Sequence, residues 1–295
     1  MTNVPMNNVE PFDDCSDVLQ DQDRDRLLSR ATDNGYLYFP RLLPADEIMR
    51  LRHELLLIHE RHDLLKEGTD PDAAIHREGV YVDVEYVKKP TPEVRTFYNE
   101  VLGLRSFNAF FHHPKVLNVL KVLLGEEILV HPRVICHIVF PRCLEHTVEP
   151  HQDFAPVRGA QNTWSVWIPL GDCDADLGGV AVASGSNQLG FLDASGLASG
   201  ELLDEKTVWN WNPFSCGDVL MFHSLAVHQG RDNVTANTIR LATSARYQPV
   251  SEPVDEHALG PQRSWAEWDE LYANWAPDDP LKYYWQSLPL DVRTY

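Results

Sequence analysis

The sequence predicts a mainly β fold with helices ahead of the strands, built as a barrel or a sandwich. Between residues 127 and 247, short alternating apolar runs are separated by Gly, Asp, Asn and Pro, whereas earlier apolar residues recur at helical spacing. Short alternating strands with regular turns are typical of a barrel or sandwich rather than of an α/β sheet. Strands are expected at residues 128–140, 163–170, 179–183, 207–211, 218–222 and 238–248.

Length and composition indicate one domain. A chain of 295 residues with 43% hydrophobic residues can bury a large core, and all-β barrels commonly reach this size as single domains. Residues 1–16 are polar and acidic without periodicity, so a loose tail is expected there. We therefore expect a single domain over 1–295, with a β core at 127–248 and an aromatic C-terminal extension at 249–295.

The segment ahead of the strands is expected to contain three helices and a strand. Helical spacing appears at residues 23–31 and 44–65, and residues 35–40 between them are aromatic and bounded by Gly and Pro, as a strand would be. A third apolar helix is expected at 114–124, ended by Gly125, which can adopt left-handed geometry.

Two further segments stand out by composition. Residues 66–95 are charged and rich in Gly and Pro around the strand-like residues 80–84, and so long a polar connection is usually functional or disordered. We expect a flap over a functional site. Residues 264–295 are too aromatic to be left in water and are expected to dock on the barrel, whose mouth is one candidate place for the contact. Their large aromatic residues are Trp265, Trp268, Tyr272, Trp275, Tyr283, Tyr284 and Trp285.

Charge and cysteine content narrow the class of protein. The net charge of −19 would repel phosphate backbones and anionic membrane surfaces, so neither nucleic acid nor a membrane is an expected partner. Five scattered cysteines without a CxxC pair suggest neither a disulfide framework nor a thiolate zinc site. The N-terminus resembles no signal peptide, and no run of residues approaches a membrane span. We expect a cytoplasmic protein with a small-molecule substrate, and a homodimer stays open.

His151, Asp153 and His228 form a candidate metal-ligand set. Residues i and i+2 of a strand project to the same side, so His151 and Asp153 can bind one ion while Gln152 points elsewhere. His228 ends a strand and turn that could bring a third ligand across a barrel. Two imidazoles and one carboxylate leave three positions open on an iron, the arrangement of non-haem Fe(II) oxygenases. Because 13 His and 44 acidic residues make such tripeptides common, His151 alone would more simply be a surface histidine.

Arg240 adds a second chemical feature, 12 residues after His228 in an otherwise apolar strand. A charged residue is rarely buried without a partner. The carboxylate of a bound small molecule would be such a partner, and a bidentate guanidinium suits it better than a lysine would.

Several separated segments together resemble the phytanoyl-CoA dioxygenase family of Fe(II)- and 2-oxoglutarate-dependent oxygenases. The resemblance covers roughly residues 20 to 250, and the ordered set is more specific than any one part. The family's PGSH motif reads Ser184-Gly185-Ser186-Asn187 here, which affects the shape of a turn rather than the ligands. The matching segments are 34–37 with 42–46, His151-Gln152-Asp153, Gly178-Gly179, 184–187, and His228, Gly230, Asn233 and Arg240.

The resemblance implies a double-stranded β-helix, or jelly roll, of the cupin-like type, with iron held by His151, Asp153 and His228. It implies 2-oxoglutarate as co-substrate with O2, the far carboxylate being held by Arg240. Trp167, eleven residues before Gly178, matches the tryptophan that contacts the co-substrate in relatives, with an ordinary core tryptophan as the alternative.

Two further residues are candidates for the co-substrate site. Gln152 lies inside the motif and is a candidate contact, with a solvent-facing glutamine as the alternative. Ser244 shares a strand face with Arg240 by parity and could donate its hydroxyl to the same carboxylate, with simple packing as the alternative.

The expected activity is the oxidation of a small organic molecule, a natural product or other metabolite of secondary metabolism, with release of succinate and CO2. Asp153 fills the coordination position that related halogenases leave free for chloride, which favours hydroxylation but leaves desaturation, epimerisation and ring formation open. The low isoelectric point disfavours CoA thioesters and polyphosphates. The alternative is a cupin-like jelly-roll binding protein without a metal or with a different one.

Overall fold

The computed structural model describes residues 6, 8–21, 23–82, 89–144, 147–193, 197 and 206–295. Its strands form two main sheets, of four and six strands, which we call sheet A and sheet B. Sheet A has the order β1-β7-β6-β9, with bounds Asn8–Glu10, Val208–Asn210, Gly179–Ala183 and His228–Arg231. Sheet B has the order β2-β8-β5-β10-β3, and β4 also pairs with β10. Its strands are β2 Tyr36–Phe39, β8 Val219–His223, β5 Trp164–Pro169, β10 Arg240–Pro249, β3 Ile128–Val130 and β4 Ile135–Val139.

The predicted mainly β class is therefore confirmed, as is the jelly roll, with two facing sheets in place of one closed barrel. The predicted strand at 128–140 is two strands, because residues 131–134 break the pairing with β10. Apolar side chains from both sheets fill part of the space between them. They are Tyr36, Tyr38, Trp167, Val180, Val182, Leu220, Phe222 and Ala242.

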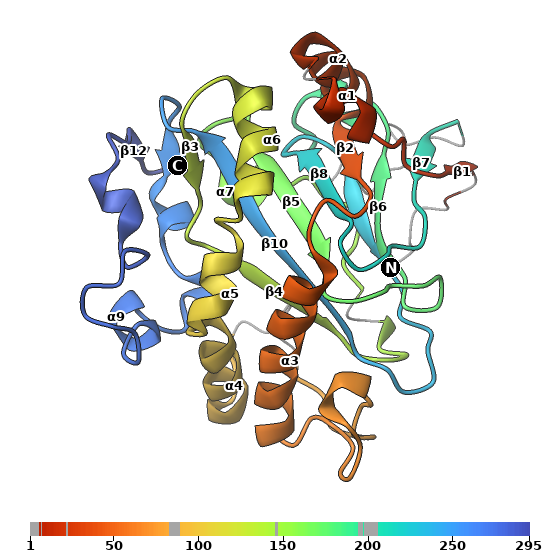
Figure 1. The fold of residues 1–295 in the computed structure, drawn as a ribbon, viewed down its shortest axis with the longest axis vertical. Helices are drawn as coiled ribbons and strands as arrows, with labels where there is room; N and C mark the ends of the chain where they lie inside the picture. The colour runs from red at the N-terminus through yellow and green to blue at the C-terminus, as the bar shows by residue number, and fades with distance from the viewer. Residues whose placement is uncertain are drawn as a thin grey trace.

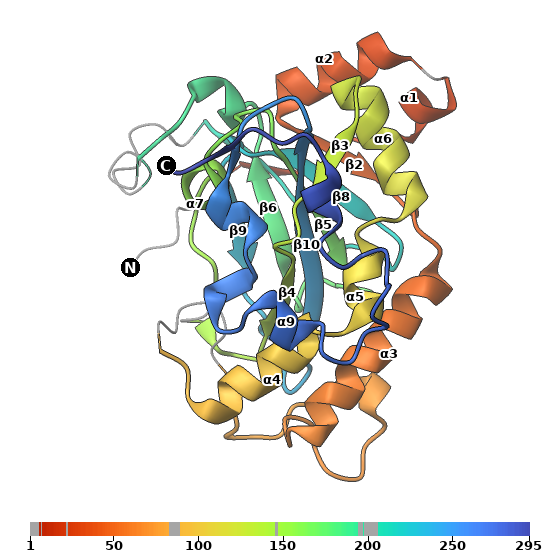
Figure 2. The same ribbon diagram turned by 90° about the vertical axis from the view of Figure 1, so that its left-hand side faces the viewer.

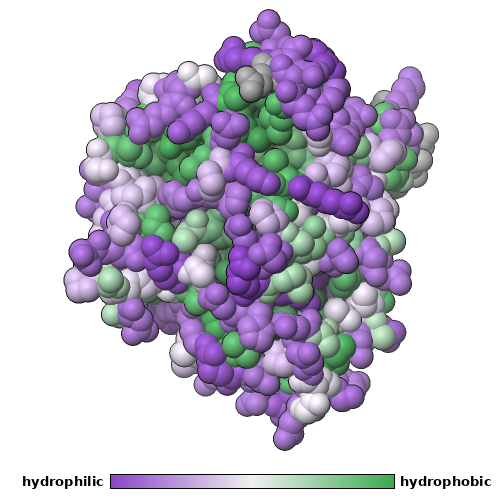
Figure 3. All heavy atoms as spheres, viewed as in Figure 1, coloured by the Kyte–Doolittle hydropathy of each residue, from purple (hydrophilic) through white to green (hydrophobic). Residues whose placement is uncertain are grey.

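Helices cover the other face of sheet B, as the two views in Figures 1 and 2 show for α3, α5 and α6. Each helix buries its apolar stripe in the largest core cluster together with the outward-facing side chains of sheet B. The exposed side of this layer is mainly hydrophilic, with apolar patches between the helices (Figure 3). The helices are α2 Arg24–Asn34, α3 Ala45–Arg61, α4 Pro92–Leu102, α5 Arg105–Phe110 and α6 Pro114–Leu124.

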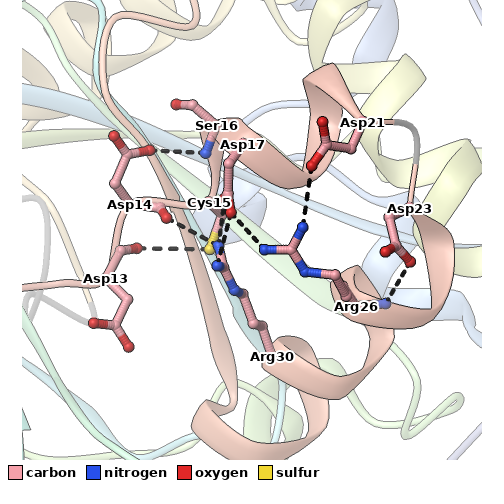
Figure 4. Close-up of polar contacts among 9 residues, drawn as sticks. All are labelled: Asp13, Asp14, Cys15, Ser16, Asp17, Asp21, Asp23, Arg26 and Arg30. Carbon is pink, nitrogen blue, oxygen red and sulfur yellow. Dashed lines mark hydrogen bonds and ion pairs between the residues drawn. The ribbon is translucent and has the colours of Figure 1, made fainter.

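The N-terminal segment is more ordered than expected. The prediction of a loose tail over 1–16 is wrong for residues 8–16, because β1 pairs with β7 and Phe12 and Cys15 are buried. Helix α1, Ser16–Gln20, is held to α2 by Asp17, which accepts hydrogen bonds from Arg26 at 2.6 Å and Arg30 at 2.7 Å (Figure 4). These are exposed ion pairs that orient α1 rather than stabilise the core.

The C-terminal extension docks as predicted. Its anchors are aromatic: Trp275 Nε1 donates to the Gly103 carbonyl at 2.7 Å, and the Tyr284 hydroxyl donates to the Val130 carbonyl at 2.6 Å. Trp285 is 5% exposed. The segment thus joins the helical layer to the edge strand β3. Its elements are β11 Val254–Asp255, η4 Glu256–Leu259, η5 Gln262–Ser264, α9 Trp268–Leu271, η6 Tyr284–Ser287 and β12 Val292–Arg293.

Of the expected flap, residues 66–82 and 89–95 are described. Residues 71–73 form the short helix η1, Pro71–Ala73, and Ile75 forms a bridge to Thr238. A strand was expected at residues 80–84. Residues 80–82 are not in a strand, and residues 83 and 84 lie outside the described residues. No helix in the described part of the chain is long and apolar enough to cross a membrane.

Candidate metal centre and its cavity

A cavity of about 600 Å³ lies between the two sheets, within the size range of small-molecule sites. β4, β5, β8 and β10 of sheet B and β6 and β9 of sheet A all contribute side chains to its wall. The C-terminal extension adds residues 262–265, so the predicted docking of that segment reaches the cavity. None of the described residues of the expected flap, 66–82 and 89–95, lines it.

His151, Asp153 and His228 converge in this cavity. Their ligand atoms all lie within 4.8 Å of one another, and His151 Nε2 is 3.7 Å from Asp153 Oδ1. The two imidazole ring centroids are 4.1 Å apart. Asp153 and His228 are buried, while His151 is partly exposed. The three residues therefore form a compact donor set that one metal ion could join.

The local structure that brings them together differs from the one expected. His151 is not in a strand with Asp153: it forms an isolated antiparallel bridge with His228, with both backbone hydrogen bonds at 3.0 Å. Asp153 has helical φ and ψ of −65° and −19° and precedes the short helix α7, Phe154–Val157. The second histidine is thus a direct neighbour of the first across a bridge, not a residue brought across a barrel.

Hydrogen bonds fix which nitrogen of each imidazole faces the cavity. His151 Nδ1 lies 2.8 Å from the Glu149 carbonyl, and His228 Nδ1 lies 3.1 Å from the Ala226 carbonyl. Because a carbonyl only accepts, each Nδ1 carries the proton and each Nε2 keeps its lone pair for a metal. Burial, followed by the neighbouring His151, lowers the pKa of His228 to about 3. A neutral imidazole is the form that binds a metal.

Asp153 is held by two residues that the sequence did not single out. Arg246 donates to both carboxylate oxygens, from Nη2 to Oδ1 at 2.7 Å and from Nε to Oδ2 at 3.2 Å, and the Ser165 hydroxyl donates to Oδ2. Burial acts to raise the pKa of Asp153, but the charge of Arg246, then the electrostatic interactions with His228 and His151, hold it well below its usual value. The carboxylate is therefore ionised and fixed in orientation before any metal binds.

Arg240 begins β10 and is 7% exposed in the cavity wall. Its Nη1 donates to the carbonyls of Leu177 at 3.3 Å, Gly179 at 3.0 Å and Arg231 at 3.0 Å. Gly178 allows this convergence: it has a φ of +88°, and a Cβ there would lie 2.5 Å from the Asp232 carbonyl oxygen. The Gly-Gly segment therefore holds the arginine side chain in place.

The other predicted co-substrate residues divide into two groups. Trp167 and Ser244 both line the cavity, and Ser244 lies on the same face of β10 as Arg240, as strand parity predicts. The Ser244 hydroxyl is 2.9 Å from His137 Nε2, and Trp167 packs on Phe214 with centroids 4.8 Å apart. Both are placed where a bound co-substrate could contact them.

Gln152 belongs to the second group, because it is not in the cavity wall. It is 1% exposed, so the alternative of a solvent-facing glutamine is wrong. Its amide donates to the Gly190 and Leu225 carbonyls at 2.8 Å and 2.7 Å and accepts from the Leu192 backbone at 2.7 Å. Gln152 therefore ties backbone segments together beside the metal ligands.

Ser186 in the divergent PGSH-like turn has a related role. Its hydroxyl donates to the Ala183 carbonyl at 2.6 Å and accepts from the Val227 backbone N–H at 2.8 Å. Val227 directly precedes His228, so this serine links the end of β6 to the start of the ligand strand β9. The turn, η3 Ser186–Leu189, thus supports the site without the family's proline or histidine.

Comparison with known proteins agrees with this geometry. The chain is 26% identical over 276 residues to 1-deoxypentalenic acid 11-beta-hydroxylase of Streptomyces exfoliatus, covering 86% of this chain and 90% of the relative. Among solved structures, the epimerase SnoN, in complex with Fe3+, alpha ketoglutarate and nogalamycin RO, matches with a TM-score of 0.58 at 19% identity, covering 79% and 86% of the two chains. EctD from S. alaskensis in its apoform matches with a TM-score of 0.55 at 18% identity, covering 87% and 85%.

These structural likenesses are likenesses of fold. The family itself is identified by sequence, because the family description phytanoyl-CoA dioxygenase (PhyH) matches residues 31–242, well over half of the chain. That segment contains the three candidate metal ligands, the Gly-Gly segment and Arg240. The chain therefore belongs to the phytanoyl-CoA dioxygenase family.

Proposed function

We propose that His151, Asp153 and His228 bind Fe(II) and that Arg240 binds the far carboxylate of 2-oxoglutarate. The observation that carries this proposal is the meeting of the donor set and a buried guanidinium in one cavity between the two sheets. Family membership makes the chain a dioxygenase that uses Fe(II), 2-oxoglutarate and O2, so the alternative of a non-catalytic binding protein is not retained.

The residues present suit such an iron. Two neutral imidazoles and one ionised carboxylate form the facial ligand set of non-haem Fe(II) enzymes, which leaves positions for a co-substrate and O2. Bound there, the iron would supply the activation of O2 that is coupled to decarboxylation of 2-oxoglutarate to succinate and CO2.

The protein's own groups prepare this chemistry. Arg246 and Ser165 keep the Asp153 carboxylate in one orientation, and the carbonyls on Arg240 Nη1 keep its guanidinium in place. Preorganisation of this kind avoids the cost of ordering the groups when the co-substrate binds. Trp167 and Ser244 are proposed to contact the 2-oxoglutarate between these points, since both line the same wall.

The substrate that we propose is a small natural product, oxidised most simply by hydroxylation. The relative from Streptomyces exfoliatus is a hydroxylase of 1-deoxypentalenic acid, and SnoN is an epimerase from nogalamycin biosynthesis, so proteins of this fold act on small natural products. A cytoplasmic location and a homodimer stay predictions.

The test is to reconstitute the protein with Fe(II) without O2, titrate 2-oxoglutarate, and then admit O2. We expect a visible charge-transfer band to appear on titration and iron-dependent succinate to form afterwards. A protein that binds no iron, or that binds iron and 2-oxoglutarate but forms no succinate with any of a library of small natural products, would contradict the proposal.

A further inference from the structure

A serine lies between the two arginines of β10 that face the cavity. Side chains two residues apart on a strand share a face, so Arg240, Ser244 and Arg246 form one row along the cavity wall. Arg246 is bound to Asp153, and Arg240 is held by backbone carbonyls. At about 3.4 Å per residue, Ser244 lies roughly 7 Å along the strand from Arg246 and roughly 14 Å from Arg240. The serine is therefore nearer, along the strand, to the residue that holds Asp153 than to Arg240.

The neighbouring strand β4 provides the hydrogen-bond partner of this serine. His137 of β4 lies directly opposite Ala242, and Ile135 lies opposite Ser244. Both β4 residues line the cavity. The small side chain of Ala242 leaves room for the imidazole to reach its diagonal neighbour, and His137 Nε2 is 2.9 Å from Ser244 Oγ. The imidazole and the hydroxyl thus form one polar pair in the wall.

The direction of this hydrogen bond decides what the serine offers to the cavity. A hydroxyl has one proton to donate and two lone pairs, and an imidazole Nε2 donates or accepts according to its tautomer. If the Ser244 hydroxyl donates to His137, only lone pairs remain for a ligand. If His137 Nε2–H donates to Ser244 Oγ, the hydroxyl proton remains for a ligand. The proton position on His137 therefore makes Ser244 an acceptor or a donor towards the cavity.

The proposed co-substrate needs the second arrangement. The polar groups of 2-oxoglutarate, two carboxylates and a ketone, all accept hydrogen bonds. A wall hydroxyl that shows only lone pairs would repel them, whereas a hydroxyl that already accepts from an imidazole can donate to them. Among the described residues, His137 is the one hydrogen-bond partner of the Ser244 hydroxyl. The donor capacity of Ser244 is thus set by this histidine alone.

We propose that His137 is a positioning residue, whose Nε2–H donates to Ser244 and directs the serine proton to the keto-acid end of 2-oxoglutarate. This inference rests on the proposed function, which places that end at His151, Asp153 and His228. The keto-acid end is chosen because Ser244 lies towards Arg246 rather than Arg240 along β10. A hydroxyl oriented in advance lowers the ordering cost when the co-substrate binds.

The test compares 2-oxoglutarate affinities in the anaerobic Fe(II) protein, followed by the charge-transfer band. His137→Phe keeps a ring and removes both nitrogens. We expect it to weaken 2-oxoglutarate binding by roughly 10-fold to 100-fold, the effect of losing a hydrogen bond to a charged group, with unchanged iron content. His137→Gln retains an N–H donor of similar reach and should restore the affinity to within roughly 3-fold of the unmutated protein.

A double-mutant cycle separates positioning from a structural role. In a Ser244→Ala background, His137→Phe should no longer change 2-oxoglutarate affinity, because the hydroxyl that it orients is gone. A histidine that only supports the fold would weaken binding by the same factor in both backgrounds. The cycle therefore measures the coupling that the proposal requires.

A second histidine beside β10 is the matched control. His131 Nε2 lies 2.8 Å from Gln248 Oε1, so it also makes a side-chain hydrogen bond to β10, but neither residue lines the cavity. His131→Phe should leave 2-oxoglutarate affinity unchanged. Circular dichroism checks the fold of each variant. If His137→Phe does not fold, His137→Asn, whose shorter side chain falls short of Ser244, gives the same comparison with His137→Gln.

The probe 2-oxobutyrate identifies the end of the ligand, because it has the keto-acid group and lacks the far carboxylate. His137→Phe should weaken its binding by the same factor as that of 2-oxoglutarate. A loss seen with 2-oxoglutarate alone would overturn the placement at the keto-acid end.

Two other results would overturn the role of His137. One is unchanged 2-oxoglutarate affinity in His137→Phe, and the other is an equal loss with and without the Ser244 hydroxyl. Absence of the charge-transfer band in the unmutated protein would instead reject the proposed function, so the two failures are distinguishable.

Discussion

The two faces of β10 are both buried but chemically opposite. All ten residues of this strand are buried. Leu241, Ala245 and Tyr247 face the helical layer and belong to its apolar core. Arg240, Ser244 and Arg246 face the cavity between the sheets.

The difference shows that burial alone does not define a core. Charged residues are costly to bury, so on a fully buried strand they are kept where other groups compensate for them. On the cavity side that compensation comes from backbone carbonyls at Arg240 and from Asp153 at Arg246. The helical side of β10 carries no charged residue and is stabilised mainly by apolar contacts. The two sides should therefore respond differently to substitution.

The largest effect is expected at the proposed metal ligands on the cavity side. His228→Ala should abolish succinate formation and iron binding while leaving the fold intact, because the helical face of sheet B does not depend on the metal. Iron content and turnover measure this. His223→Gln, five residues earlier on β8 and outside the cavity wall, is the matched control and should retain both. Full activity of His228→Ala would exclude it as a ligand.

The pair between Arg246 and Asp153 should have the next largest effect, this time on stability. Arg246→Met leaves a carboxylate that is 4% exposed without its bidentate partner. Breaking a buried pair from one side costs about 3–5 kcal/mol. The free energy of unfolding by urea, in the metal-free protein, measures it. The double variant Arg246→Met, Asp153→Leu should recover much of that loss, and a double variant as unstable as the single one would show that packing, not charge, is responsible.

Arg240 tests the cavity side without removing a metal contact. Arg240→Ala should weaken 2-oxoglutarate binding by roughly 30-fold to 1000-fold, corresponding to about 2–4 kcal/mol for a buried charge-assisted contact. Iron content should not change. Titration of the charge-transfer band gives the affinity, and a value within about 2-fold of the unmutated protein would mean that the co-substrate binds elsewhere.

The smallest effect belongs to the helical side, where His59 of α3 is buried as a neutral ring. Its Nδ1 donates to the Leu55 carbonyl at 2.7 Å, and burial lowers its pKa to about 4. Since the unfolded histidine has a pKa of about 6.5, the unfolded state binds more protons between these values, and stability is lost as the pH falls from about 6.5 towards 4.

Between pH 7 and 5.5 this histidine should contribute a loss of about 1 kcal/mol. His59→Met should remove that part of the pH dependence, whatever it does to stability at pH 7. Urea unfolding of both proteins across this pH range measures the slope. Identical slopes would show that His59 is not the titrating group.

The sequence predicted that the candidate ligands lie together better than it predicted their surroundings. His151, Asp153, His228 and Arg240 were singled out because their order along the chain resembles that of a family, and the structure brings all four to one cavity. The argument that residues i and i+2 of a strand share a face predicted correctly that His151 and Asp153 lie together, but the local structure it assumed is wrong. His151 is held by a bridge to His228, and Asp153 directly precedes helix α7. A family motif therefore carries more information than the geometry inferred from its spacing.

The residues that were missed have partners far away in the chain. Arg246 has the same strand parity as Arg240 and Ser244, and this signal was available, but nothing near it identifies Asp153, 93 residues earlier, as its partner. Helix α4 was also missed, although Thr91 accepts from the Val94 N–H and Pro92 occupies the first turn, both helix-start signals. These signals were overlooked because the start of α4 lies within the charged segment 66–95, which was interpreted as a flap.

The position of β10 in the chain has a consequence for synthesis on the ribosome. Among the described strands, β3 and β4 pair only with β10, which begins about a hundred residues after β4 ends. At typical elongation rates both strands wait roughly five to twenty seconds for it, with their hydrogen-bonding edges unpaired. A message truncated before codon 240 would still encode every metal ligand. Its product should nevertheless aggregate rather than act as a weaker enzyme, and the soluble yield of a chain ended at residue 239 would reveal whether completing the sheet is the last step of folding.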